Sequence, residues 1–442
     1  MVNNLKIEPI PSGAPQRNEE SIRAFQRKIY RKAKQDKGYR FYSLYDKITS
    51  ERILREAYHK VKENDGSPGI DNITFEEIEQ KGIDEFIKGI EEELKRGTYK
   101  PEPVKRVYIE KANGKLRPLG IPTIKDRVVQ MSCKIVIEPI FEARFEENSY
   151  GFRPKRKAAD AICKIREKVL SEGKKIVYDA DITKYFDNIR HDKLQTLLMR
   201  EITDKKVLNL LKMWLKTPIS EDGKLTKSVC GTPQGGVISP LMANIYLNEL
   251  IKEVNRKGSI FQKNGIDIIT YADDFVLIGT SISPTVIKEL KRLLGIMGLE
   301  LNEEKSKLVN LFEGRIKFLG FEMGWEKIKH KKVKRYLRIS PSGDSVKKLR
   351  GNLREVIDGR RASTGVFLAE EINKKLRGWI NYFRIGTITN VQKAKESINW
   401  YINKKLYYLH KKKKSQKRSH LINQGIMMVY IERYGMISPL AM

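Results

Sequence analysis

Cysteine and histidine are scarce in this sequence of 442 residues, and the few that occur lie far apart. The three cysteines, Cys133, Cys163 and Cys230, form no C-x-x-C pair, so neither a disulfide framework nor a zinc ribbon is expected. The five histidines form no H-E-x-x-H motif or mixed Cys/His cluster, which argues against a zinc site. These absences favour a protein of a reducing compartment whose chemistry does not use zinc.

Long apolar runs are absent as well. No stretch approaches the roughly 18 consecutive apolar residues of a membrane-spanning helix. The N-terminal segment M-V-N-N-L-K-I-E-P-I-P-S-G has no basic region followed by an apolar core, so no secretory signal is expected. We therefore expect a soluble, cytoplasmic protein with no membrane partner. Its 40% hydrophobic content excludes wholesale disorder, because that much apolar material can offset the entropy lost on folding.

Acidic residues are too few to balance the basic ones. The sequence has 87 Lys and Arg against 55 Asp and Glu, a formal net charge of +32. The excess is uneven, since residues 326–420 carry 27 basic against 7 acidic residues and residues 17–40 carry nine against three. A balance this basic indicates a polyanionic partner.

Two of the basic segments each have two interpretations. In residues 17–40, Ile22, Phe25 and Ile29 recur at helical spacing, which predicts an amphipathic helix with one apolar stripe. Its cationic remainder is either a solvated surface or a contact for RNA. The lysine tract that begins at Lys411 is likewise either a solvated tail or a segment that binds a polyanion.

Alternating apolar residues over 104–121, interrupted by the turn A-N-G-K at 112–115, predict a β-hairpin. Its cationic side chains include Lys111 and Arg117. A hairpin of this kind is either a clamp for phosphates or a sheet edge that lysines protect from aggregation. Upstream, the turn-forming residues N-D-G-S-P-G-I-D-N at 64–72 predict a rigid loop between two helices.

Adjacent carboxylates occur beside two predicted strands. The segment I-D-I-I-T-Y-A-D-D-F-V-L-I-G at 266–279 predicts two apolar strands joined by a tight turn that contains Asp273 and Asp274. A strand over 176–178 runs into Asp179 and Asp181. Taken alone, an Asp-Asp pair is equally compatible with an ordinary turn that faces solvent. Carboxylates beside buried strands are costly to desolvate, however, unless a hard divalent cation with oxygen ligands accompanies them.

The two acidic strand ends together predict a metal site. If they lie side by side in one sheet, Asp181 and Asp273 can bracket two Mg²⁺ ions about 3.5–4 Å apart. Such a pair stabilises the attacking and leaving oxygens of phosphoryl transfer, which is the chemistry of polymerisation on nucleic acid.

These segments and several others resemble reverse transcriptases, most closely the group II intron-encoded reverse transcriptases, or maturases. The resemblance extends over nearly the whole chain from about residue 20 and includes a maturase, or X, domain. The motifs that carry it are G-S-P-G-I-D at 66–71, K-L-R-P-L-G-I-P-T-I-K-D-R at 115–127, S-Y-G-F-R-P at 149–154, D-I-T-K-Y-F-D at 181–187, G-T-P-Q-G-G-V-I-S-P-L-M-A-N-I-Y at 231–246, Y-A-D-D at 271–274, G-L-E-L-N-E-E-K-S-K at 298–307, F-L-G-F at 318–321 and L-R-G-W-I-N-Y-F at 376–383.

The resemblance implies a role for each matching residue. Asp181 and Asp273 would hold the two Mg²⁺ ions, with Asp274 assisting. The incoming deoxynucleoside triphosphate would be bound by residues of the fingers and palm. These residues are Lys111 and Arg117 at the triphosphate, Phe186 under the sugar, where it would exclude a ribose 2′-OH, and Gln234 in the nucleotide pocket. Lys305 would lie near the primer grip.

The implied fold is α+β, a right-hand polymerase with fingers, a palm built on an antiparallel ferredoxin-like sheet, and a thumb. The expected regions are a basic N-terminal extension at 1–62, fingers at 63–173, palm at 174–325 and a basic helical thumb and maturase domain at 326–442. In the last region, Lys374, Arg377, Asn381 and Arg384 fall on one helical face and predict nucleic-acid binding. The opposite face, Leu376, Ile380 and Phe383, is expected to be core.

The implied function is an RNA-directed DNA polymerase of a group II intron, which copies an RNA template from a DNA primer and assists splicing and mobility of the intron RNA. A bacterial-type cytoplasmic ribonucleoprotein is the implied setting. Two alternatives remain at this point: an RNA-binding splicing cofactor in which catalysis is secondary, or a domesticated relative with a defence or repair role. Many relatives continue into an H-N-H endonuclease domain with metal-binding cysteines. Beyond the maturase-like helix of this sequence the only histidines are His410 and His420, so such a domain is not expected.

Overall fold

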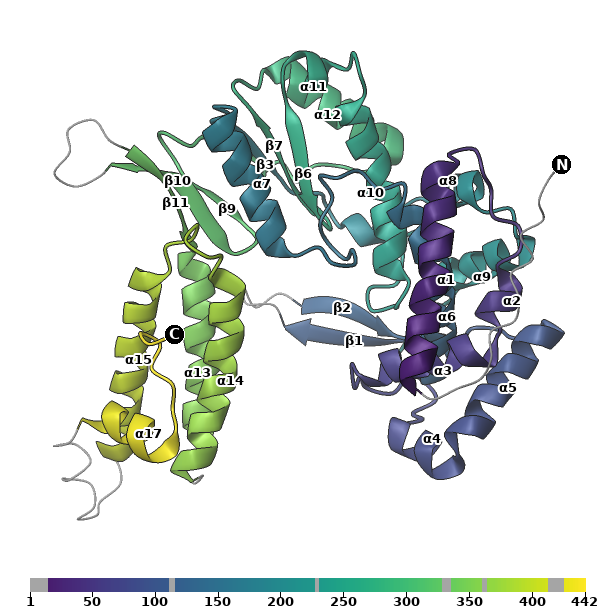
Figure 1. Ribbon diagram of the computed structural model, residues 1–442, viewed down its shortest axis with the longest axis horizontal. Coiled ribbons are helices and arrows are strands. Elements are labelled where there is room, and N and C mark those ends of the chain that lie inside the picture. Colours follow the sequence, from purple (N-terminus) through teal and green to yellow (C-terminus); the bar gives the residue numbers. More distant parts are fainter. Residues whose placement is uncertain (1–14, 111–115, 227–229, 328–334, 360–363, 412–424) are drawn as a thin grey trace. The chain divides into compact units, whose positions relative to one another are not determined.

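The structure is a computed structural model that describes residues 15–110, 116–226, 230–327, 335–359, 364–411 and 425–442 (Figure 1). The chain forms two compact units, each assembled from segments that are distant in sequence. The first comprises the described parts of Met1–Arg156, Asp181–Lys263 and Pro284–Asn302, and the second those of Lys157–Ala180, Asn264–Ser283 and Glu303–Met442. Within these ranges, no helix is both long enough and apolar enough to cross a lipid bilayer.

The first unit is mainly helical and is organised around α6 (Ile124–Glu142). Thr123 caps this helix by accepting a hydrogen bond of 3.1 Å from the backbone N–H of Asp126. Apolar side chains occur all around α6, and most of them are buried, so the helix lies in the interior of the unit. The basic helix α1 (Pro15–Gln35) and α3 (Glu51–Lys62) both pack against α6.

The other helices of this unit pack around α6 and against one another. They are α2 (Tyr45–Ile48), α4 (Phe75–Lys81), α5 (Ile83–Arg96), α8 (His191–Glu201), α9 (Lys205–Lys216), α10 (Ser239–Asn255), α11 (Ile260–Lys263) and α12 (Pro284–Met297), with a short 3-10 turn at Tyr185–Asp187. In α1, Ile22, Phe25 and Ile29 are buried, which confirms the predicted amphipathic helix.

A small sheet in the first unit contains the predicted hairpin. Strands β1 (Val104–Glu110) and β2 (Leu116–Ile121) pair antiparallel, and β1 also pairs in parallel with β4 (Ile219–Glu221), which continues to β5 (Lys224–Thr226). The predicted antiparallel pairing of the two strands is therefore confirmed, whereas the A-N-G-K turn at 112–115 lies outside the described residues. β2 rather than β1 lies at the edge of the sheet. The predicted loop at 64–72 is anchored from α6, because the Arg127 guanidinium donates to the carbonyls of Gly66 and Ser67.

The second unit contains an antiparallel sheet with the strand order β6-β7-β3-β8. Its strands are β3 (Ile176–Ala180), β6 (Asp267–Tyr271), β7 (Asp274–Gly279) and β8 (Lys307–Asn310). Residues 275–278 of β7 are fully buried, as expected of a strand covered on both faces, and α7 (Ala158–Ser171) packs against β6. A second antiparallel sheet is formed by β9 (Ile316–Phe318), β10 (Phe321–Lys327) and β11 (Arg335–Pro341).

A helical bundle forms the C-terminal part of this unit. Helices α13 (Gly343–Gly359), α14 (Gly365–Phe383) and α15 (Gln392–Lys411) lie side by side, with α17 (Ile426–Tyr434) packed on α14 and α15 (Figure 1). One apolar stripe from each helix builds the core, which includes Leu353, Ile372 and Ile402. The predicted core face of α14 is confirmed, because Leu376, Ile380 and Phe383 are all buried.

Candidate active site and nucleotide-binding residues

The acidic turn joins strands β6 and β7. Tyr271 and Asp274 form the last pair of the ladder, so Ala272 and Asp273 are the two loop residues. Ala272 adopts a left-handed backbone conformation with φ of 56°, which is strained for a residue other than glycine. Asp274 is exposed and Asp273 is partly exposed. The tight turn therefore holds both carboxylates at the end of a buried hairpin.

The second acidic strand lies beside this hairpin, as predicted. β3 pairs antiparallel with β7, and its last residue, Ala180, is opposite Phe275. Asp274 immediately precedes Phe275 in the chain, and Asp181 immediately follows Ala180. The predicted end of the strand at residue 178 is wrong, because Asp179 pairs with both Val276 and Lys307 and so extends β3.

The chain after β3 is fixed by a different motif. The carbonyl of Asp181 accepts a hydrogen bond of 2.7 Å from the Asn302 N–H, and Ile182 forms an antiparallel bridge with Leu301. The G-L-E-L-N segment therefore supports the backbone of the first catalytic candidate. Lys305, the predicted primer-grip residue, is exposed in the turn that leads from this segment to β8.

Within the described ranges, no group of three or more His, Cys, Asp or Glu residues is gathered as a metal-binding cluster. Mg²⁺ is commonly held by one or two carboxylates together with substrate phosphates and water, so its binding does not require such a cluster. The oxygen donors of Asp181, Asp273 and Asp274 have the chemistry that this ion prefers.

The turn G-T-P-Q-G-G packs against strand β2. Gly235 has φ of 119°, and a Cβ atom there would lie 2.3 Å from the carbonyl oxygen of Gly120. The Gly120 N–H in turn donates 2.7 Å to the Gln234 carbonyl. On the other side, the N–H of Thr232 donates 2.8 Å to the carbonyl of Phe186. Glycine is required here because two backbone segments approach so closely.

This turn brings together the predicted nucleotide-binding residues that the structure describes. Arg117 Nε donates 3.1 Å to Gln234 Oε1, and Gln234 Nε2 donates 3.3 Å to Asp187 Oδ1. Phe186, one residue earlier, is 9% exposed and packs edge-on against Tyr185. Asp187 was not singled out from the sequence, although it belongs to the D-I-T-K-Y-F-D motif. Lys111 lies outside the described residues.

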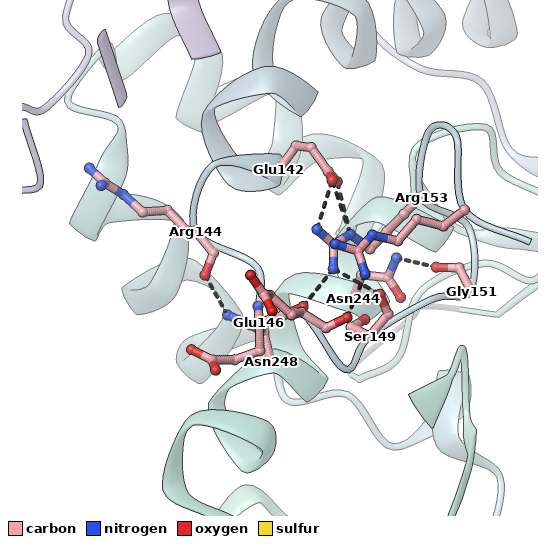
Figure 2. Close-up of polar contacts among 10 residues, drawn as sticks. Glu142, Arg144, Glu146, Ser149, Gly151, Arg153, Asn244 and Asn248 are labelled. Carbon is pink, nitrogen blue, oxygen red and sulfur yellow. Dashed lines mark hydrogen bonds and ion pairs between the residues drawn. The ribbon is translucent and has the colours of Figure 1, made fainter. Parts of the chain in front are cut away.

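The S-Y-G-F-R-P motif is anchored by a buried arginine (Figure 2). The Arg153 guanidinium binds both oxygens of Glu142, at 2.7 and 2.9 Å, and donates to the carbonyls of Glu146 and Ser149. From α10, Asn244 donates 2.8 Å to the Gly151 carbonyl. Two helices thus hold this loop, which sequence analysis recognised as a motif without predicting the ion pair.

The same loop presents Phe152 at the surface. Its φ is 54° and half of the side chain is exposed. Because a left-handed backbone is unfavourable for a bulky residue, the anchoring by Arg153 and Asn244 is what maintains this conformation.

The predicted nucleic-acid-binding residues of α14 are on its exposed side, with one exception. Lys374, Arg377 and Asn381 are exposed, and Lys374 pairs with Glu371 at 2.7 Å.

The placement of Arg384 on the same helical face is wrong, because α14 ends at Phe383 and Arg384 has an extended backbone. Thr389 Oγ1 binds both the Phe383 carbonyl and the Ile385 N–H and so turns the chain away. Arg384 donates to the Met442 carbonyl.

The tyrosine of the L-R-G-W-I-N-Y-F motif was not predicted to contribute to the site. Tyr382 Oη donates 3.0 Å to the carbonyl of Leu319, in the F-L-G-F motif. The lysine tract that begins at Lys411 extends into residues 412–424, which lie outside the described ranges.

Comparison with known proteins gives two regional matches. Residues 109–323 match the family of reverse transcriptases (RNA-dependent DNA polymerases). Residues 346–423 match the group II intron maturase-specific domain. These regions contain, respectively, the acidic strand ends with the glycine-rich turn and most of the helical bundle.

Three relatives illustrate the similarity. Protein YkfC of Escherichia coli (strain K12) is 34% identical over 337 residues, 68% of this chain and 88% of that protein. The group II intron-encoded protein LtrA of Lactococcus lactis subsp. cremoris is 39% identical over 233 residues, 52% of this chain and 38% of LtrA. Nuclear intron maturase 2, mitochondrial, of Arabidopsis thaliana is 34% identical over 179 residues, 31% of this chain and 24% of the relative.

The matched regions define the class of the protein as a reverse transcriptase joined to a maturase-specific domain. The chain belongs to the group II intron reverse transcriptase and maturase family, and its enzymatic class is RNA-directed DNA polymerase. The family predicted from the sequence motifs is confirmed.

Proposed function

We propose that the chain extends a DNA primer on an RNA template with Asp181, Asp273 and Asp274 as the catalytic carboxylates. The observation that carries this proposal is the register of β3 on β7, in which Ala180 is opposite Phe275. Asp181 directly follows Ala180 in the chain, and Asp274 directly precedes Phe275. A basic protein has no structural need for carboxylates at two neighbouring strand ends, whereas phosphoryl transfer does need them.

Two magnesium ions fit this set of oxygen donors, and Asp181 and Asp273 would hold them with the help of Asp274. When bound, the ions would lower the pKa of the primer 3′-OH and neutralise charge on the triphosphate. The chain's own contribution is the placement of the carboxylates, since the tight turn at Ala272 and the Asn302 hydrogen bond to Asp181 fix the two backbones. Preorganised charge of this kind lowers the barrier without reorganisation during the reaction.

The deoxynucleoside triphosphate would be bound by Arg117, Gln234 and Phe186, together with Lys111. The hydrogen bonds from Arg117 to Gln234 and from Gln234 to Asp187 support this assignment, because they orient both side chains before a nucleotide binds. Phe186 is nearly buried beside this network, as a residue that limits the space at the sugar would have to be.

The right-hand arrangement belongs to the same proposal: a basic extension at 1–62, fingers at 63–173, palm at 174–325 and thumb with maturase domain at 326–442. Lys305 and the exposed residues of α14, together with Arg384, would contact the phosphates of the RNA and the primer. Contacts of this kind are independent of sequence and weaken with salt.

Splicing assistance is the second activity that we propose. The excess of basic residues at 326–420 supports it, because folded intron RNA presents a dense phosphate surface. A bacterial-type ribonucleoprotein with the intron RNA would be the working form. The two alternatives differ from this proposal in different ways. A splicing cofactor would bind the intron RNA with little polymerisation, and a domesticated enzyme of defence or repair would polymerise without binding an intron.

Primer extension on an RNA template with Mg²⁺ tests the polymerase, and sequencing of the RNA that copurifies with the full chain tests the partner. We expect extension with deoxynucleotides and enrichment of a group II intron. Extension without intron enrichment would favour a domesticated enzyme. Intron binding and splicing without extension would favour the cofactor.

A further inference from the structure

A second strained turn occurs in the same compact unit as the acidic turn. Between β9 and β10, Leu319 and Gly320 both have left-handed backbones, with φ of 51° and 78°. A two-residue turn with two positive φ values suits an antiparallel hairpin, but the first position normally takes glycine, asparagine or aspartate. A leucine at this position persists only if neighbouring groups hold the turn.

Both carbonyls of this turn are held by the helical bundle. The Leu319 carbonyl accepts the 3.0 Å hydrogen bond from Tyr382 Oη, at the end of α14. The Gly320 carbonyl accepts 2.8 Å hydrogen bonds from Ser345 Oγ, in the first turn of α13, and from the N–H of Ser342, directly before this helix. Any Cβ at Gly320 would lie 2.9 Å from Ser345 Oγ, so the turn fits closely against the helices.

Strand β9, which leads into the Leu319–Gly320 turn, packs against β3, and β3 pairs with the hairpin that carries the acidic turn. Burial raises the pKa of Tyr382, and Tyr271 and Asp274 raise it further. Its ring stacks on Phe321 at 5.8 Å between centroids and meets Phe383 edge-on at 4.8 Å. Tyr382 is nevertheless 44% exposed, so part of its surface remains open.

We propose that Tyr382 is a positioning residue for polymerisation, which fixes the Leu319–Gly320 turn relative to the acidic turn and so aligns the primer 3′ end for reaction. This inference rests on the proposed catalytic role of Asp273 and Asp274. It makes the C-terminal end of α14, a helix of the maturase-specific domain, part of the polymerase machinery.

The hydroxyl can be separated from the ring in this role. Phenylalanine at position 382 retains the stacking on Phe321 and the contact with Phe383, and it removes only the hydrogen bond to the turn. Because the side chain is partly exposed, loss of the hydroxyl leaves little unsatisfied polar surface in the interior. Small misplacements of reacting groups reduce turnover strongly, whereas binding of the long duplex depends on many phosphate contacts.

The test is single-nucleotide primer extension by the full chain carrying Tyr382→Phe. We expect kcat to fall about 3- to 10-fold, corresponding to the loss of one hydrogen bond, with KM for the primer-template and the thermal midpoint unchanged. Ser345→Ala, which loosens the other carbonyl of the turn, should have the same effect. The double variant should lose little more than either single variant, because both act through one turn. Tyr408→Phe, at an exposed tyrosine of α15, is the matched control and should behave as wild type.

Unchanged kcat in Tyr382→Phe would overturn the inference. So would a fall in kcat that parallels a fall in thermal midpoint, because the residue would then only support the fold. Asp273→Asn, measured in the same assay, separates failure of the positioning role from failure of the catalytic assignment. An inactive Asp273→Asn with a fully active Tyr382→Phe refutes only the positioning role, whereas an active Asp273→Asn refutes the catalytic assignment on which it rests.

Discussion

Arg117 on β2 donates a 3.1 Å hydrogen bond to the side-chain oxygen of Gln234, in the glycine-rich turn. The Gln234 amide continues the contact to Asp187, beside Phe186. Three motifs that are distant in sequence therefore meet in one polar network. Its cation and amide are oriented by one another, which would reduce the entropy lost on binding if this network holds the triphosphate as proposed.

Arg117→Ala should therefore weaken use of the nucleotide more than it weakens the fold. We expect kcat/KM for deoxynucleotides to fall about 10- to 100-fold, since a hydrogen bond to a charged group contributes about 1.5–3 kcal/mol. Gln234→Ala should act in the same direction, and the double variant should be less impaired than the product of the two effects. Steady-state primer extension measures this. Arg96→Ala, on the exposed end of α5, is the control, and equal losses in it would refute the assignment.

Asp273→Asn should abolish extension while RNA affinity and stability stay close to wild type. The change removes one negative charge from the proposed metal site without removing a phosphate contact. Asp181→Asn should behave alike, and the two losses should be strongly non-additive because each disables the same site. Asp65→Asn is the matched control, because Asp65 has φ of 41° in a loop, a conformation that asparagine tolerates. Near-wild-type extension by Asp273→Asn would exclude the carboxylate from catalysis.

Phe186→Val should admit ribonucleotides more readily. The expected change is in the ratio of kcat/KM for deoxynucleotides and ribonucleotides, which should fall about 10-fold or more if the ring excludes the 2′-OH. Phe186→Ala should give a larger change, but a buried phenylalanine truncated to alanine costs about 3–5 kcal/mol of stability. Phe261→Val, at a buried phenylalanine of α11, controls for loss of packing. A constant ratio would mean that Phe186 is only core.

The sequence predicted the features that depend on local pattern. Apolar runs bounded by aspartates located β3, β6 and β7, and the helical spacing of Leu376, Ile380 and Phe383 located the buried face of α14. Such patterns report burial directly, because side-chain direction alternates in a strand and recurs every three to four residues in a helix. The boundaries were less accurate: pairing on both sides extends β3 past Tyr178, and Thr389 ends α14 before Arg384.

Contacts between distant residues could not be predicted in this way. Gln234 and Asp187 are 47 residues apart, and Tyr382 and Leu319 are 63 apart. Neither pair has a periodic signature, since their meeting depends on how whole elements pack. The Arg153–Glu142 ion pair joins residues that are nearer in sequence, but it could not be predicted either. Most arginines are exposed, and the residue type alone does not indicate which one is buried.

The ion pairs of Glu172 with Lys168 and Lys174 should make the stability of the folded protein change with pH in the acidic range. Hydrogen bonds from Lys168 and then Lys174 lower the pKa of Glu172 to about 2, from its ordinary value of 4.5. A depressed carboxyl pKa stabilises the folded state above the unfolded pKa, and this contribution is lost as pH falls from about 4.5 to about 2. Glu172→Gln should thus cost about 1 kcal/mol near pH 6, the value being limited by the 38% exposure of the side chain.

Denaturant unfolding of wild type and Glu172→Gln between pH 6 and pH 2.5 measures this effect. The difference in unfolding free energy should shrink as the pH falls. An equal difference in unfolding free energy at pH 6 and at pH 2.5 would mean that the ion pairs of Glu172 do not cause it. Glu167→Gln, at an exposed residue of α7 that pairs with Lys164, provides the control, because α7 ends directly before Glu172.

The exposed side of α14 should bind nucleic-acid phosphates, because its other side is committed to the core of the bundle. Replacing Lys374, Arg377 and Arg384 by Gln should make the slope of log K against log salt shallower by roughly 0.7–0.9 for each phosphate that is no longer neutralised. Lys374 already pairs with Glu371, and Arg384 with the Met442 carbonyl. Each must therefore exchange a protein partner for a phosphate, so the decrease in affinity should be smaller than for an uncommitted cation.

Filter binding of a template-primer and of folded intron RNA measures both slopes. Both should change together, because the two ligands present the same charged backbone. The control is a triple variant with the same decrease in charge, Lys252→Gln, Arg256→Gln and Arg292→Gln, on residues that each pair with a glutamate on α10 or α12. An α14 variant with an unchanged thermal midpoint and the wild-type slope would mean that another surface binds the RNA. An equal change of slope in the control variant would mean that net charge, and not this face of α14, determines the slope.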